Sequence, residues 1–153
     1  MKRSIDKAVG AILMPYYRVG GRRTLQPLLL TRVQTDGSFG SPVGARAAAV
    51  ITAPNGFEAA GQMIHVPEAR SSTEAEWASI AFGLRLALEN NHETIGLEND
   101  CLGVVSALMY PMNPLRHAYA RHYRGVVYGL AAQTMWTGVR WIPRQINRAD
   151  DLF

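Results

Sequence analysis

The sequence predicts an α/β fold: a mixed five-stranded sheet with helices packed on it, in the element order β-β-β-α-β-α-α-β. Three observations lead to this prediction. The first half of the chain has apolar runs separated by turn signals, which is typical of an antiparallel meander. Apolar residues then recur at helical spacing. After that, short strand-like runs alternate with helical runs up to a final strand, as in a sheet that carries helices on its face.

Three strands are expected in the first half of the domain. The run PLLLTRVQTDGSF ends in the turn signal Asp36-Gly37, and the run ARAAAVITAPNG ends in Asn55-Gly56. Asn-Gly between apolar runs is a strong hairpin signal, so FEAAGQMIHVP is the expected returning strand. Residues 1–27 are expected to form an N-terminal arm, either a short amphipathic helix or a partly ordered segment. The domain is expected to span residues 28–153.

The second half begins with a long helix over SSTEAEWASIAFGLRLALE, residues 71–89. TIGLEND is a short strand, and LGVVSALM is a short helix stopped by Pro111. Another helix is expected from Leu115 to about Gln133, and TGVRWIP is the last strand. These elements complete the predicted order.

The composition is that of one folded globular domain, since 153 residues are enough to bury a core. The formal net charge of +4 favours an anionic partner. No apolar run is long enough for a membrane span, so no membrane partner is expected. The single cysteine, Cys101, excludes an intrachain disulfide and suits a reducing compartment, so a cytoplasmic location is expected. The oligomeric state is not defined by these features.

Four acids stand at the ends of predicted elements, where distant parts of the chain can meet. Asp36 ends the first strand, Glu76 lies in the first turn of the long helix, Asp100 ends the fourth strand, and Asp150 follows the last strand. Carboxylates that converge repel one another unless a cation neutralises them, and hard oxygen ligands suit Mg²⁺ or Mn²⁺. Two such ions roughly 4 Å apart can promote phosphodiester hydrolysis.

Each of these acids also has an ordinary structural interpretation. Asp36 before a glycine is a common turn residue, and Asp100 can cap the helix that follows it. Asp150 and Asp151 can be solvated acids near the end of the sequence. The metal-site hypothesis therefore depends on the combination of the acids and on their order.

The segments TDGSFGSPVGARAAAVI, SSTEAEWASIAFGLRLAL, IGLENDCLGVVSAL and VRWIPRQINRADDL together resemble the type 1 ribonuclease H family. The resemblance implies a ribonuclease H-like fold and an enzyme that cuts the RNA strand of an RNA–DNA hybrid with two Mg²⁺ (or Mn²⁺) ions. It implies that Asp36, Glu76, Asp100 and Asp150 are the metal-binding and catalytic acids. The Asn-to-Asp spacing is one residue short, so Asp151 is the alternative to Asp150.

The chain also departs from the family pattern. The family's Thr-Asn-Asn stretch, which helps to hold the nucleic-acid backbone, is Ser71-Ser72-Thr73 here. A Pro-Arg pair replaces the histidine-bearing loop of many members, which implies a place for Arg144 near the scissile phosphate or the leaving product. From the residues themselves, a basic helix face that includes Arg121 and Arg124 can contact phosphates, as an alternative to a solvated face. The predicted nucleic-acid contacts are Ser41, Ser71, Ser72, Thr73, Arg121, Arg124 and Arg144.

Two glutamates at the entrance of the long helix have different predicted roles. Ser71 and Glu74 match a capping box, which leaves Glu76 free on the margin of the apolar stripe. Glu74 is therefore expected to be the helix's acid and Glu76 the acid of the active site. Two other functions remain open: a non-catalytic module of the same fold that binds nucleic acid or protein, and a nuclease that acts on DNA.

Overall fold

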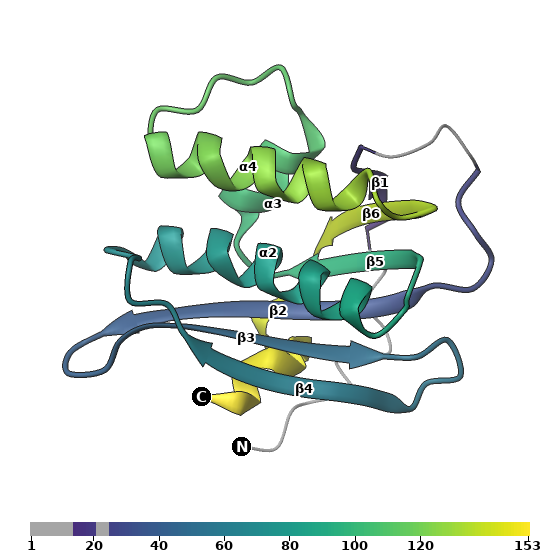
Figure 1. Ribbon diagram of the computed structural model, residues 1–153, viewed down its shortest axis with the longest axis horizontal. Coiled ribbons are helices and arrows are strands. Elements are labelled where there is room, and N and C mark those ends of the chain that lie inside the picture. The colour runs from purple at the N-terminus through teal and green to yellow at the C-terminus, as the bar shows by residue number, and fades with distance from the viewer. Residues whose placement is uncertain (1–13, 21–24) are drawn as a thin grey trace.

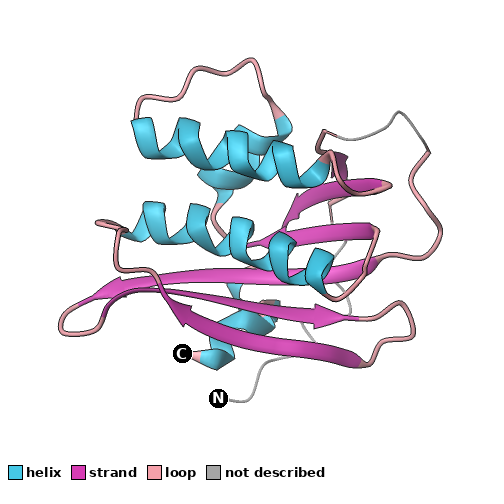
Figure 2. Ribbon diagram, in the orientation of Figure 1, coloured by secondary structure: helices cyan, strands magenta, loops and turns pink. Residues whose placement is uncertain are grey.

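The computed structural model describes residues 14–20 and 25–153, whose strands form one mixed sheet with the α-helices on one side (Figures 1 and 2). The strands are β1 (Tyr17–Arg18), β2 (Thr31–Gly40), β3 (Gly44–Thr52), β4 (Glu58–His65), β5 (Thr94–Asn99) and β6 (Trp136–Trp141). The helices are α2 (Ser72–Glu89), α3 (Leu102–Met109) and α4 (Ala118–Ala131), followed by the 3₁₀ segments η1 (Arg144–Ile146) and η2 (Arg148–Leu152).

The described strands lie in the order β1-β6-β5-β2-β3-β4. β2, β3 and β4 pair antiparallel, whereas β2 with β5 and β5 with β6 pair parallel. The predicted α/β class is confirmed, and from residue 28 onward the elements follow the predicted order. The sheet has six strands instead of five, because Tyr17 and Arg18 pair antiparallel with Val139 and Gly138 of β6. Residues 1–13 and 21–24 of the predicted arm lie outside the described residues.

The predicted boundaries differ most clearly from the structure in β2 and α4. β2 does not turn at Asp36-Gly37 but continues to Gly40, and the turn falls at residues 41–43. Gly37 is needed inside the strand for the close approach of α2 that is described below. Helix α4 begins at Ala118, three residues later than expected.

The main core lies between α2 and the sheet. Ile80 and Leu84 of α2 are fully buried with Val33 of β2 and Leu97 of β5. The helix comes close to β2 at Gly83, where a Cβ atom would lie 2.4 Å from the Cγ2 of Thr35. α4 packs beside α2, so that the two long helices cover one face of the sheet (Figure 1). None of the helices in the described part of the chain is long and apolar enough to cross a bilayer.

The other face of β3 is covered by the C-terminal 3₁₀ segments, drawn in yellow in Figure 1. Ala48 and Val50 form a small core there with Ala149 of η2, and Leu152 and Phe153 pack against it. β3 is thus buried on both faces, which explains its nearly continuous apolar run. The packing places η2, which contains Asp150, beside the middle of the sheet.

Candidate active site

The contact between β2 and the first turn of α2 places the first two acids. A Cβ atom on Gly37 would lie only 2.3 Å from the carbonyl carbon of Ala75 and 2.4 Å from the backbone nitrogen of Glu76. The lack of a side chain therefore allows the helix to lie directly on the strand. The Gly37 N–H donates a hydrogen bond of 2.5 Å to Oε1 of Glu76. Glu76 is thereby held beside Asp36.

Three of the four predicted acids form a compact cluster. One carboxylate oxygen from each of Asp36, Glu76 and Asp100 lies within 4.8 Å of the others. Asp150 lines the same open cavity of about 280 Å³, whereas Asp151 is exposed and does not line it. The lining residues are Asp36, Gly37, Ser38, Glu76, Asp100, Arg144, Asp150 and Phe153. The structure thus brings together the four preferred acids from β2, α2, the end of β5 and η2.

Two buried amide side chains join the segments that carry Asp100 and Asp150. The Nδ2 of Asn147 donates to the backbone oxygen of Thr35 at 2.9 Å and to Oδ2 of Asp100 at 3.1 Å. The Nδ2 of Asn99 donates to the same Thr35 oxygen at 3.0 Å. No role was predicted for either asparagine. Their positions in the sequence could have pointed to such a role, because each asparagine lies close to a predicted acid. Asn99 directly precedes Asp100, and Asn147 lies shortly before Asp150.

The electrostatics of the cluster favour a bound cation. Burial, together with the negative charges of Glu76 and Asp100, raises the pKa of Asp36 to about 9. Burial also raises the pKa of Glu76 to about 7, although the Gly37 N–H opposes this shift. Both carboxyls are hard to ionise because they are buried beside other acids, and a bound cation would supply a compensating positive charge. The cluster of oxygen donors beside an open cavity therefore fits a hard divalent ion.

The two glutamates at the start of α2 occupy different environments. The Glu74 N–H donates to the Ser71 Oγ at 3.1 Å, and Oε1 of Glu74 accepts from the Arg70 N–H at 3.1 Å. Glu74 therefore takes part in the N-terminal cap of the helix. Glu76 points to the acid cluster instead. This is the division that the sequence predicts.

The residues predicted to contact nucleic acid lie in several places. Ser41 is exposed in the turn between β2 and β3, and Arg144 lines the acid cavity, with its side chain 75% exposed. Ser71 and Thr73 line a second open cavity at the start of α2, and Ser72 is exposed beside them. These residues therefore line two different cavities, or lie beside one of them or in the β2–β3 turn. Their contact with nucleic acid stays a prediction.

The two arginines of α4 have structural partners. Arg121 donates to the backbone oxygens of Leu115 and Arg116 at 2.7 and 3.2 Å, and Arg124 donates to that of Asn113 at 2.9 Å. The backbone oxygens of residues 113, 115 and 116 thus accept from arginine side chains. This agrees with the start of α4 at Ala118, three residues later than predicted. Arg121 and Arg124 thus hold the loop that precedes the helix.

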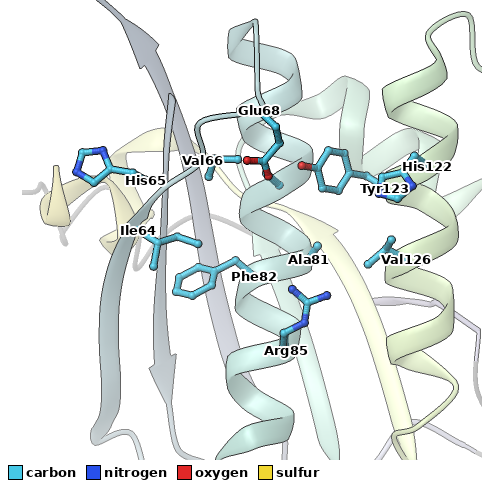
Figure 3. A pocket seen from close by; sticks show the side chains of 11 residues that line it. Ile64, His65, Val66, Glu68, Ala81, Phe82, Arg85, His122, Tyr123 and Val126 are labelled. Atoms are coloured by element: carbon cyan, nitrogen blue, oxygen red, sulfur yellow. The ribbon is translucent and has the colours of Figure 1, made fainter. Parts of the chain in front are cut away.

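A further cavity, of about 240 Å³, lies between β4, α2 and α4 (Figure 3). Phe82 and Arg85 of α2 and Tyr123 of α4 line it, with Glu68 at one end. None of the four predicted acids is among its lining residues. It is therefore separate from the candidate active site.

The strand order of this mixed sheet defines a ribonuclease H-like fold. Carboxylates from β2, α2, the end of β5 and η2 surround one cavity and form an acid cluster that is suited to a metal ion. Residues 34–153 match the model of the reverse transcriptase-like family, which is ribonuclease H-like. The chain belongs to this family, within the ribonuclease H family that its motifs predicted. A search among curated proteins found no match.

Solved structures support the same fold. RNase H1 from the halophilic archaeon Halobacterium salinarum NRC-1 is 22% identical, with a TM-score of 0.71 over 80% of this chain and 92% of that one. The N-terminal RNase H domain of a Mycobacterium tuberculosis protein is also 22% identical, with a TM-score of 0.71 over 81% and 90%. LC11-RNase H1, solved in complex with an RNA/DNA hybrid, is 18% identical, with a TM-score of 0.68 over 80% and 92%.

Proposed function

We propose that the chain is a metal-dependent endonuclease that hydrolyses the RNA strand of RNA–DNA hybrids. The observation that carries the proposal is the meeting of four acids, distant in sequence, at one cavity. Bringing carboxylates together and burying them is costly without a cation. A module that only bound nucleic acid would gain nothing from such a cluster, so the acids favour catalysis over the non-catalytic alternative.

The residues of the cluster have distinct tasks in this proposal. Asp36, Glu76 and Asp100 would hold the divalent ions, Mg²⁺ or Mn²⁺, and Asp150 would complete the set. The chemistry that two such ions supply is the activation of a water molecule and the stabilisation of the leaving oxygen. Asn147 restrains one oxygen of Asp100 through its 3.1 Å hydrogen bond, so the Asp100 carboxylate keeps one orientation.

Arg144 is the basic residue among those that line the acid cavity. Its guanidinium lies 3.5 Å from Oδ1 of Asp150, and its side chain is 75% exposed at the cavity. It is placed to contact a phosphate of the substrate while Asp150 keeps it near the acids. A guanidinium suits this task because it presents several donors to phosphate oxygens.

An RNA–DNA hybrid is the proposed substrate for two reasons. The formal net charge of +4 favours a polyanion. A similar structure, that of LC11-RNase H1, was solved with an RNA/DNA hybrid bound. Ser41 and the segment 71–73 are the proposed contacts with the duplex, where an enzyme specific for RNA must recognise the 2′-hydroxyls.

The test is cleavage of an end-labelled RNA–DNA hybrid by the purified protein in Mg²⁺ or Mn²⁺, compared with duplex DNA and single strands. Cleavage of the RNA strand of the hybrid alone is expected. Asp100→Asn should abolish cleavage, whereas Asp151→Asn, which removes the same charge from outside the cavity, should retain it. Hybrid binding without cleavage would favour the binding module, and cleavage of duplex DNA would favour the DNA-directed nuclease.

A further inference from the structure

Gln34 is a buried amide that joins β2 to the segment preceding Asp150. It lies two residues before Asp36, and only 3% of it is exposed. Its Oε1 accepts the Arg148 N–H at 3.0 Å, and its Nε2 donates to the Ile146 backbone oxygen at 3.2 Å. One side chain thus holds both flanks of Asn147, which caps η2.

The second N–H of the Gln34 amide donates to Oε1 of Glu98 at 3.0 Å. Glu98 is fully buried in β5, and the arginines on either side of it neutralise its charge. Arg32 donates to both of its oxygens, and Arg140 and the hydroxyl of Tyr16 donate to Oε2.

The Glu98 carboxylate, which accepts from both arginines, fixes the orientation of the Gln34 amide. A carboxylate with its oxygens held by arginines can only accept, so the amide must turn its nitrogen towards Glu98. The carbonyl oxygen of Gln34 then faces the Arg148 N–H, as the structure shows. Every strong hydrogen-bonding group of the buried amide has a partner, which is the condition under which such a network rigidifies its surroundings.

We propose that Gln34, oriented by Glu98, is a positioning residue for Asp150. The segment that carries Asp150 consists of two short 3₁₀ pieces and has no long helix to hold it. On the solvent side its anchors are exposed groups, such as the ion pair of Arg148 with Glu58 at 2.6 Å. Exposed pairs of this kind contribute little. The buried anchors of the segment are the Asn147 hydrogen bond to the Thr35 oxygen, the packing of Ala149 and the Gln34 clamp. The clamp is the one that holds both flanks of Asn147, and so fixes the direction in which the segment leads to Asp150.

The proposal rests on the proposed nuclease function, and the test separates the two. Gln34→Met keeps the length and apolar volume of the side chain but removes all three hydrogen bonds. Gln62→Met, on the exposed edge strand β4, is the matched control. Gln34→Asn is the second variant, because its amide stays polar but is too short to hold both flanks of Asn147. Circular dichroism should show that each variant is folded.

The first readout is amide hydrogen exchange, which does not depend on activity. Exchange at Arg148 should accelerate at least tenfold in Gln34→Met relative to Gln62→Met. Unchanged exchange would overturn the proposal, even if the wild-type protein proves not to cleave a hybrid. Absence of cleavage by the wild-type protein would by itself refute only the nuclease function.

The second readout is the kinetics of hybrid cleavage. In Gln34→Met, kcat should fall roughly 10- to 100-fold, because a displacement of about 1 Å in a catalytic group costs up to about 100-fold in rate. KM should stay within about twofold, since no proposed substrate contact lies on the clamp. In an Asp150→Asn background the same substitution should cause no further loss, because Gln34 acts through Asp150. Additive losses would show a general structural role and would overturn the proposal.

Discussion

Gly37→Ala is the substitution that tests how the first two acids are brought together. The added Cβ would lie 2.3 Å from the carbonyl carbon of Ala75, whereas ordinary contact begins at 3.4 Å. The first turn of α2 must therefore retreat by about 1.1 Å, the difference between these two distances. The atoms that the new Cβ would meet belong to the backbone of Ala75 and Glu76, so rotation of a side chain cannot relieve the clash.

The retreat has two measurable consequences. Overpacking costs about 1–3 kcal/mol, and weakening the Gly37 hydrogen bond to the Glu76 carboxylate adds up to about 2 kcal/mol. The free energy of unfolding should therefore fall by about 1–5 kcal/mol. A 1 Å displacement of Glu76 should also reduce cleavage by about 100-fold.

Gly40→Ala is the matched control, because nothing lies within 4 Å of a Cβ atom at that position on the same strand. Urea unfolding and hybrid cleavage should be measured for both variants. Gly40→Ala should be as stable as the wild-type protein and fully active. Equal stability and equal activity of the two variants would refute the role given to Gly37.

Three further predictions follow from the site. Glu74→Gln should lower stability slightly with little effect on cleavage, whereas Glu76→Gln should abolish cleavage in a folded protein; the reverse outcome in paired unfolding and cleavage assays would exchange their roles. Because burial raises the pKa of Asp36 to about 9 and of Glu76 to about 7, the folded metal-free protein binds protons more tightly than the unfolded chain. Its Tm should therefore fall as the pH rises from about 4 to about 9, and Asp36→Asn should flatten this slope; a rising Tm would contradict the assignment. Asp150→Asn should reduce cleavage far more than Asp151→Asn, and equal losses in the cleavage assay would argue against the choice of Asp150.

Much of the fold is predictable from the sequence because its elements carry distinct periods. The apolar spacing in residues 72–89 and the Asn55-Gly56 turn place α2 and the β3–β4 hairpin directly. β1 was not predicted, since a pair of two residues is too short to carry a pattern. The turn predicted at Asp36-Gly37 was wrong because Gly37 allows the close approach of α2 to the strand. That contact is between distant parts of the chain and cannot be read from the local sequence.

Glu76, Asp100 and Asp150 were predictable for a similar reason, since each stands at or near the end of an element. Asp36 was predicted to end a strand but lies within β2. Their supporting amides were not. Gln34 bonds to Arg148 and Asn147 bonds to Thr35, each across more than a hundred residues, so these contacts depend on the folded sheet. The arginines of α4 show the opposite case, because a basic face that suggests nucleic-acid contact also holds a loop.

The central claim is that the four acids form one divalent-cation site. Anomalous diffraction from a crystal soaked in Mn²⁺ tests it most directly. We predict a Mn²⁺ peak among the carboxylates of Asp36, Glu76 and Asp100, with Asp150 facing it across the same cavity. The peak should be lost in crystals of Asp36→Asn. Saturating Mn²⁺ without a peak at this cluster, in a crystal where the cavity is open to solvent, would contradict the claim.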